Sequence, residues 1–329
     1  MKWLPDAALG RLRTAADLPD LSATHYVLLD KLGEGGMGAV YRVEDKLLGR
    51  MVALKVIRLA DSNGTLAERL LREAKIIAQL EHPGIVPVHD VGTLPDGRVF
   101  YTMKLVQGRR LDQLTVEPGG LPEILRSFQK ICEAVSFAHA HNVLHRDLKP
   151  QNIMVGRFGE VLVMDWGLAK VLHGEAAPEI QGGARAERRE LLAEPVTVGV
   201  ETEHGAILGT PGYMAPEQAR GDIAAIGPRA DVYSLGAVLK FLLQSSGVVP
   251  RALAAIAAKA TAEDLEQRYA SVEEMGNDIA YYLDGLPVLA YPEGAIRRAW
   301  KWVVKNRAWI LLIVAYLAMR GLFILWRSR

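Results

Sequence analysis

The stretch HRDLKPQN (residues 145–152) places a histidine, an arginine, an acid, a lysine and an amide within one short segment. It follows directly on the mostly apolar run ICEAVSFAHAHNVL (131–144). A solvated surface loop could carry these residues by chance. A catalytic loop would instead use Asp147 as a base and Asn152 as a metal ligand. The rest of the chain decides between these two interpretations.

Upstream, the glycine-rich stretch GEGGMGAV (33–40) lies between two strand-like runs. Its glycines would let backbone amides approach phosphate oxygens, and Val40 would cover an adenine ring. Glycine turns between strands are common, so this stretch alone is a weak signal. A dinucleotide-binding fold would need a helix directly after the glycines. Here VYRVED (40–45) continues as a strand, which points away from that fold.

The apolar strand MVALK (51–55) ends in Lys55, whose ammonium would be costly to bury without a partner. Glu73 lies in GTLAERLLREAKIIAQL (64–80), where apolar residues recur at helical spacing. A pair of Lys55 and Glu73 would fix the ammonium so that it could hold phosphates. Alternatively, either residue could be an ordinary surface side chain whose charged end reaches water.

Downstream, the strand-like run in VLVMDWGLAK (161–170) ends in Asp165. A carboxylate near a phosphate cradle is a suitable ligand for Mg²⁺, because that hard cation prefers oxygen. Residues 171–205 have no sustained period and are expected to form a long mobile insertion. The motif GTPGYMAPEQ (209–218) then indicates a structured segment.

The order and spacing of these motifs match the signature set of the protein kinases, and the chain resembles a bacterial serine/threonine kinase of the eukaryotic-like (Hanks) type. The resemblance covers residues 26–286. It implies an α+β bilobal fold, with a small β-rich N-lobe containing one helix (about 26–106) and a larger, mainly helical C-lobe (about 107–286). The implied activity is transfer of the γ-phosphoryl group of ATP to serine or threonine hydroxyls of proteins. Mg²⁺, or alternatively Mn²⁺, would be the cofactor ion.

The resemblance also assigns roles to residues of the HRDLKPQN loop. Asp147 would accept the proton of the substrate hydroxyl, and Lys149 would steady the transferring phosphoryl group. Asn152 and Asp165 would hold the metal.

The nucleotide is expected to lie between the lobes, with Met103 behind the pocket and residues 104–106 forming the hinge. The full set of expected nucleotide-binding residues is Leu32, Gly33, Glu34, Gly35, Gly36, Met37, Gly38, Val40, Ala53, Lys55, Glu73, Met103, Lys104, Val106 and Met154.

Regulation is expected in the segment between Asp165 and Glu217. Thr197 or Thr202 would be autophosphorylated, and Arg146 would pair with the new phosphate and order the segment. By the same resemblance, Thr210 faces the substrate.

The chain departs from the family pattern in two places. Trp166 stands where phenylalanine is usual, which leaves the metal ligand and the hinge glycine in place. After DVYSLGAVLKFLLQ (231–244) an extra helix and loop are missing, which puts the usual docking surface for proteins in doubt. Asp231 and Arg268 still match the pattern, and Arg268 is expected to pair with Glu217.

Two other functions compete with this interpretation. A nucleotide-binding pseudokinase scaffold would typically have lost Lys55, Asp147 or Asp165, and all three are present. A small-molecule phosphotransferase of related fold is disfavoured by the Ala-Pro-Glu motif (215–217) and the long activation segment.

Composition narrows the function further. The formal net charge of +1 argues against nucleic-acid binding through overall basicity. The single cysteine, Cys132, excludes an internal disulfide and fits a reducing compartment. Residues 1–25 are interpreted as an N-terminal extension and not as a secretory signal.

The C-terminal region indicates a membrane. Residues 287–307 are basic, and AWILLIVAYLAMRGLFILW (308–326) is apolar apart from Arg320. At about 1.5 Å per residue, a helix of this length approaches the roughly 30 Å hydrocarbon core. We therefore expect a single-pass anchor with the kinase domain in the cytoplasm, because the flanking positive charge favours that side. The alternatives are a core helix or attachment to the membrane surface. Substrates, the activating signal and the oligomeric state are not indicated.

Overall fold

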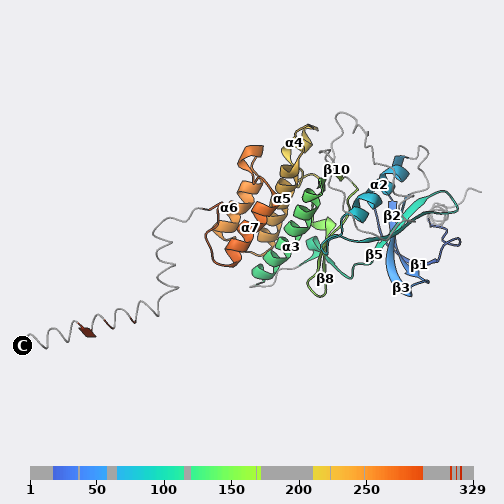
Figure 1. The fold of residues 1–329 in the computed structure, drawn as a ribbon, viewed down its shortest axis with the longest axis horizontal. Coiled ribbons are helices and arrows are strands. Elements are labelled where there is room, and N and C mark those ends of the chain that lie inside the picture. Colours follow the sequence, from blue (N-terminus) through green and yellow to red (C-terminus); the bar gives the residue numbers. More distant parts are fainter. Residues whose placement is uncertain are drawn as a thin grey trace, which may run out of the picture.

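The computed structural model describes residues 18–35, 38–57, 65–114, 120–167, 169–171, 210–222, 224–247, 249–291, 312, 316 and 319–320. Within these ranges the chain forms a β-rich N-lobe and a larger helical C-lobe, as Figure 1 shows. The bilobal α+β class expected from the sequence is confirmed.

The N-lobe is built on one antiparallel, five-stranded sheet with the strand order β1-β2-β3-β5-β4. The strands are β1 (Tyr26–Glu34), β2 (Gly38–Asp45), β3 (Arg50–Ile57), β4 (Val88–Thr93) and β5 (Val99–Lys104). Gly49 and Gly97 adopt positive φ angles of 60° and 83° in the turns that lead into β3 and β5. These are conformations that glycine adopts without steric cost. Helix α2 (Thr65–Gln79) packs against β5, β4 and β3.

The C-lobe is mainly helical. Its elements are α3 (Leu121–Ala140), the short α4 (Pro216–Ala219), α5 (Pro228–Ser245), α6 (Arg251–Ala260) and α7 (Val272–Leu283), with 3₁₀ turns η1 (Leu111–Gln113), η2 (Pro150–Asn152) and η3 (Leu265–Gln267). Strands β6 (Gly108–Arg110), β8 (Ile153–Gly156) and β9 (Val161–Val163) form a small sheet, and β7 (Val143–Leu144) pairs with β10 (Lys170–Val171). Only a short connection joins α5 to α6, as the shortened sequence predicted.

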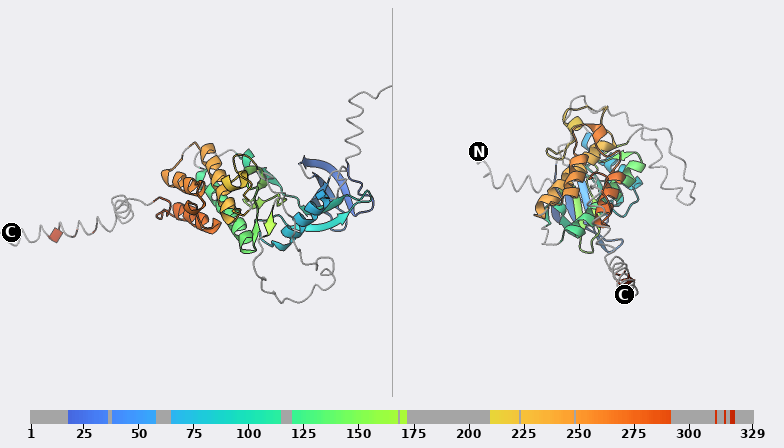
Figure 2. Two further views of the ribbon diagram at one scale, coloured as in Figure 1. Left: turned by 90° about the horizontal axis from the view of Figure 1, so that it is seen from above. Right: turned by 90° about the vertical axis from the view of Figure 1, so that its left-hand side faces the viewer.

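One apolar core runs through both lobes. It includes buried residues of α2 and β5 as well as those of α3, α5 and α7. The chain before β4 meets β9 directly, because the amide of Val163 donates to the carbonyl of Gly84 at 2.8 Å. In Figure 2 the sheet and the C-lobe helices lie at opposite ends of the molecule, with the β8–β9 region between them. The HRDLKPQN loop, which leads into β8, and Asp165, which follows β9, fall in this middle region.

The C-lobe ends in a strap, residues 286–291, that lies against α7. Asp278 of α7 is fully buried and accepts hydrogen bonds from the amides of Leu289 (2.8 Å) and Ala290 (3.0 Å). The hydroxyl of Tyr269 donates to the same carboxylate at 2.7 Å, and Val288 is buried in the core. The packed chain therefore continues to Tyr291, beyond Leu286, where the sequence predicted the domain to end.

Four expected segments fall wholly or partly outside the described residues: positions 1–17 of the N-terminal extension, the insertion after Val171, positions 292–307 of the basic segment, and all but four positions of 308–326. Among the described residues, no helix is long and apolar enough to cross a membrane.

Candidate functional site

Asp231, a buried aspartate of α5, accepts hydrogen bonds from the backbone of the HRDLKPQN loop. Both carboxylate oxygens of Asp231 are engaged: the backbone amides of His145 and Arg146 each donate at 2.9 Å, and His139 Nε2 lies 2.7 Å away. Burial would raise the pKa of Asp231, but the hydrogen bond from His139 and the backbone donors hold it below its ordinary value. Arg146 takes a positive φ of 69° at this point. These contacts fix the backbone that presents Asp147.

Asp147 is the centre of a compact polar network. Its Oδ2 accepts from Lys149 Nζ at 2.7 Å and from Asn152 Nδ2 at 3.2 Å. Its Oδ1 accepts from the Thr210 hydroxyl at 2.9 Å. Lys149 Nζ also donates to Thr210 Oγ1 at 2.7 Å. Thr210, which lies far from the loop in sequence, is thus brought to the expected base.

Lys55 joins the two lobes. Its Nζ donates to both carboxylate oxygens of Glu73 at 2.8 Å and lies 3.3 Å from Asp165 Oδ1. The predicted pair of Lys55 and Glu73 is therefore present. Burial opposes the charge on Lys55, but its neighbours Tyr101, Glu73 and Asp165 raise its pKa above the ordinary value. The ammonium is held as a cation where the lobes meet.

Asp165 follows β9 with a positive φ of 57° and a half-exposed side chain. Burial would raise the pKa of its carboxyl, but Lys55 holds it below the usual range. Trp166 is fully buried beneath it, with its ring centroid 4.6 Å from that of His145 and its indole N–H 3.4 Å from the Val163 carbonyl. The larger ring is thus accommodated in the core.

The donor atoms near Asp165 suit a hard cation. Asn152 uses its amide nitrogen on the Asp147 carbonyl at 2.9 Å, which leaves its oxygen for another partner. Mg²⁺ is typically bound by one or two protein oxygens together with substrate phosphates, and a carboxylate and an amide oxygen are ligands of that kind. Among the described residues, no group of three or more His, Cys, Asp and Glu could hold a metal ion.

The expected nucleotide-binding residues come mainly from the face of the N-lobe sheet that carries Lys55. Ala53 and Met103 are register partners across β3 and β5, and both are buried. A Cβ added to Gly38 would lie 2.1 Å from the Val56 carbonyl, so only glycine fits there. The other described members are Leu32, Gly33 and Glu34 on β1, Gly35 after it, Val40 on β2, Lys104 on β5, Val106 beyond it and Met154 on β8. Gly36 and Met37 lie outside the described residues.

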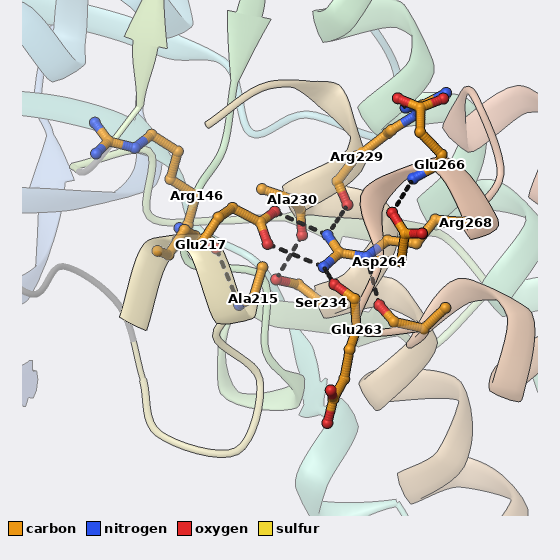
Figure 3. Close-up of polar contacts among 12 residues, drawn as sticks. Arg146, Ala215, Glu217, Arg229, Ala230, Ser234, Glu263, Asp264, Glu266 and Arg268 are labelled. Atoms are coloured by element: carbon orange, nitrogen blue, oxygen red, sulfur yellow. Dashed lines mark hydrogen bonds and ion pairs between the residues drawn. The ribbon is translucent and has the colours of Figure 1, made fainter. Parts of the chain in front are cut away.

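Figure 3 shows a second polar cluster, centred on Arg268. Its guanidinium donates to both carboxylate oxygens of Glu217 at 2.8 and 2.9 Å, and it also bonds the carbonyls of Ala262, Arg229 and Glu263. The pair predicted from the sequence is therefore confirmed. It anchors the end of the activation segment to the C-lobe.

Arg146 lies beside this cluster but does not join it. Its side chain points away from Glu217 in Figure 3, and its buried Nε has no hydrogen-bond partner among the residues that the structure describes. Burial lowers the pKa of this guanidinium. Thr197 and Thr202, which are expected to supply a phosphate for it, lie outside the described residues.

Two contacts were not anticipated from the sequence. The hydroxyl of Tyr101 donates to Glu73 Oε1 at 3.0 Å, and His139, in the last turn of α3, contacts Asp231. The register of β5 opposite Lys55 could have indicated the first contact, but nothing in the sequence fixed that register.

Comparison with known proteins agrees with this geometry. The sequence profile described as the protein kinase domain matches residues 26–280. The chain is 35% identical over 314 residues to the serine/threonine-protein kinase PknD of Protochlamydia amoebophila, covering 80% of this chain and 30% of that protein. It is 36% identical over 305 residues to PknD of Chlamydia felis (80% and 31%) and 37% identical over 305 residues to PknD of Chlamydia muridarum (79% and 32%). The chain therefore spans about a third of the length of these relatives.

Proposed function

The chain belongs to the protein kinase domain family, and from this membership we propose that it transfers the γ-phosphoryl group of ATP to serine or threonine hydroxyls of proteins. The observation that carries the proposal is the convergence of Asp147 with Lys149 and Thr210 next to the Lys55–Glu73–Asp165 contacts. Asp147, which can accept a proton, and the cationic side chains of Lys149 and Lys55 thus lie where the lobes meet. Phosphoryl transfer depends mostly on positioning and charge stabilisation, which such an arrangement supplies.

In the proposed reaction Asp147 accepts the proton of the substrate hydroxyl as the oxygen bonds to the γ-phosphorus. The bond from the γ-phosphorus to the β-phosphate oxygen breaks, and ADP leaves. Lys149 stabilises the transferring group, and Lys55 holds the phosphates that remain on ADP. The hydrogen bond from Thr210 to Asp147 supports this assignment, because it places a hydroxyl donor against the same carboxylate at 2.9 Å.

Asp165 and Asn152 are the residues proposed to hold Mg²⁺, with Mn²⁺ as an alternative. Bound there, the ion would neutralise negative charge on the phosphates. The adenine would lie against Val40, Ala53 and Met154, with the hinge at residues 104–106.

The polypeptide is proposed to comprise an N-terminal extension (1–25), the kinase domain (26–286, with the strap continuing to 291), a basic segment and an anchor (308–326). The basic charge and apolar length of the last two segments support a single-pass protein whose kinase domain faces the cytoplasm. Fractionation of cells expressing the protein with and without residues 296–329 tests the anchor. Recovery of the full-length protein in the soluble fraction after gentle lysis would contradict it.

Activation is proposed to proceed by phosphorylation of Thr197 or Thr202, with Arg146 as the phosphate partner. The Nε of Arg146 supports this role, because it is buried and has no hydrogen-bond partner within the described part of the chain. Mass spectrometry of active protein is expected to find phosphate on one of these threonines. A fully active protein with an unmodified segment would contradict it.

The decisive experiment for the activity is to incubate the purified protein with labelled ATP, Mg²⁺ and casein and to identify the phosphorylated amino acids. We expect phosphoserine or phosphothreonine. Nucleotide binding without any transfer would favour the pseudokinase alternative.

A further inference from the structure

The carboxylate of Glu73 has a hydrogen-bond donor in addition to Lys55. Tyr101 lies on β5, and its backbone is the register partner of Lys55 on β3, so both side chains project from the same face of the sheet. Glu73 reaches that face from α2. The Tyr101 hydroxyl lies 3.0 Å from Glu73 Oε1, and Lys55 Nζ lies 2.8 Å from each carboxylate oxygen. Three donor contacts therefore converge on one carboxylate.

All three side chains are withdrawn from water. Glu73 and Tyr101 are 1% and 2% exposed, and the side chain of Lys55 is 12% exposed. Burial raises the pKa of the Glu73 carboxyl, while Lys55 and Tyr101 oppose that rise. Burial also raises the pKa of Tyr101 well above its ordinary value, so the phenol remains a donor at neutral pH. A buried carboxylate that loses one donor cannot replace it with water.

We propose that Tyr101 is a positioning residue for phosphoryl transfer: its hydroxyl holds Glu73, and with it helix α2, so that Lys55 is already in place before ATP binds. This inference rests on the proposed function, because it concerns the lysine that would hold the phosphates. The sheet supplies two of the three groups, Lys55 and Tyr101, on adjacent strands. Helix α2 supplies the third and follows a connection that joins it to β3. The helix is thus the element whose position Tyr101 fixes.

The variant Tyr101→Phe removes the hydroxyl and keeps the ring. A buried hydrogen bond to a charged group changes an equilibrium by about tenfold to a hundredfold. The fraction of molecules with α2 docked should fall accordingly, and the apparent dissociation constant for nucleotide should rise in proportion to that loss. We expect the KM for ATP to rise several-fold or more. At saturating ATP the bound nucleotide draws the helix back, so kcat should change by less than about twofold.

The matched control is Tyr26→Phe. Tyr26 is also a buried tyrosine of this sheet, and its hydroxyl contacts Asp90 at 3.0 Å and Thr102 at 3.3 Å. Thr102 is the neighbour of Tyr101 and faces the other side of the sheet. Tyr26→Phe should lower the stability of the protein without changing its affinity for nucleotide or the hydrogen exchange of α2. A purely structural Tyr101 would behave in the same way as Tyr26.

The test uses the full chain and three measurements: titration with a fluorescent ATP analogue and Mg²⁺, hydrogen–deuterium exchange of α2, and steady-state kinetics. We expect Tyr101→Phe, and not Tyr26→Phe, to weaken binding of the ATP analogue and to speed hydrogen exchange in α2. In a Glu73→Gln background, Tyr101→Phe should have little further effect on affinity, because the two changes disrupt one interaction. Unchanged affinity and unchanged α2 exchange in Tyr101→Phe would overturn the proposal, as would full additivity with Glu73→Gln.

These readouts separate the two levels of inference. Analogue binding and hydrogen exchange need no phosphoryl transfer. If the unmodified chain binds the analogue but phosphorylates nothing, the proposed function fails while the role of Tyr101 in positioning Glu73 is still decided by the first two measurements.

Discussion

Arg268 and Glu217 form a bidentate ion pair whose two side chains are 0% and 1% exposed. The guanidinium uses its remaining donors on backbone carbonyls, so neither charge is left without a partner. The pair links the short helix α4, at the end of the activation segment, to the chain that precedes α7.

Removing one member of this pair should strongly destabilise the C-lobe. The change Glu217→Ala leaves the buried guanidinium without its carboxylate, and we expect it to lower the free energy of unfolding by about 3–5 kcal/mol. Urea denaturation measures this loss. The control is Glu266→Ala: Glu266 pairs with Arg229 in the same region, but its side chain is 78% exposed, so the effect should be much smaller. An equal loss of unfolding free energy in the two variants would show that the buried pair is no more stabilising than the exposed one, contrary to this prediction.

Replacing Asp147, the proposed base, should abolish phosphoryl transfer and leave nucleotide binding nearly unchanged. In Asp147→Asn the side chain keeps its size but no longer accepts a proton, so kcat should fall by about 10²–10⁴-fold. Affinity for a fluorescent ATP analogue should change little, because Asp147 contacts Lys149, Asn152 and Thr210 and not the residues proposed to hold the nucleotide. Full activity in this variant would refute the assignment.

Acid should weaken the support of the catalytic loop through Asp231. Its folded-state pKa lies below the ordinary aspartate value of about 3.9. The stability it contributes is therefore fully present above that ordinary value and is lost as pH falls through the lower folded-state pKa. The free energy of unfolding, measured against pH, should fall less steeply in this window for Asp231→Asn than for the unmodified protein. Parallel curves would show that Asp231 does not titrate as described.

The single cysteine offers a probe of opening between α3 and α7. Cys132 is 2% exposed, and burial raises the pKa of its thiol above the ordinary value. A Cβ added to Gly276 of α7 would lie only 3.2 Å from the Cβ of Cys132, so the two helices pack closely there. We expect a thiol reagent to label the native protein very slowly and the unfolded protein at once. Rapid labelling under native conditions would contradict this packing.

The strap should contribute to the stability of the C-lobe. Asp278→Ala would leave the amides of Leu289 and Ala290 and the hydroxyl of Tyr269 without their acceptor, at an expected cost of about 2–4 kcal/mol. Tyr269→Phe removes only one of the three donors and should cost less. Thermal or urea unfolding of both variants gives the order. A Tyr269→Phe variant as unstable as Asp278→Ala would locate the effect in the tyrosine.

Local motifs allowed much of the site to be predicted. The pairs Lys55–Glu73 and Glu217–Arg268 could be anticipated because each residue lies in a motif that resembles a protein-kinase motif. In that family the two residues of each pair contact each other. The same motifs indicated the two lobes, since the period of apolar residues changes from strand-like to helical near Gly108.

Contacts that depend on tertiary register could not be predicted. Tyr101 reaches Glu73 only because β5 pairs with β3 at Lys55, and His139 reaches Asp231 only because α3 and α5 pack side by side. The strap was missed for a related reason. Residues 286–291 have neither helical nor strand period, and the hydrogen bonds to Asp278 come from backbone amides, which carry no sequence signature.

The strap also determines how the kinase domain would respond to mechanical load. A pull on the chain beyond Tyr291 would act first on the two amide hydrogen bonds to Asp278 and on the packing of Val288 in the core. The two hydrogen bonds attach the strap directly to α7. The load would enter the C-lobe at α7 and α3, the helix that packs against it, and would reach α2 and the N-lobe sheet only after crossing the whole C-lobe. Because His139 of α3 contacts Asp231, which holds the backbone before Asp147, such a load would reach the HRDLKPQN loop through α3 before it reached α2.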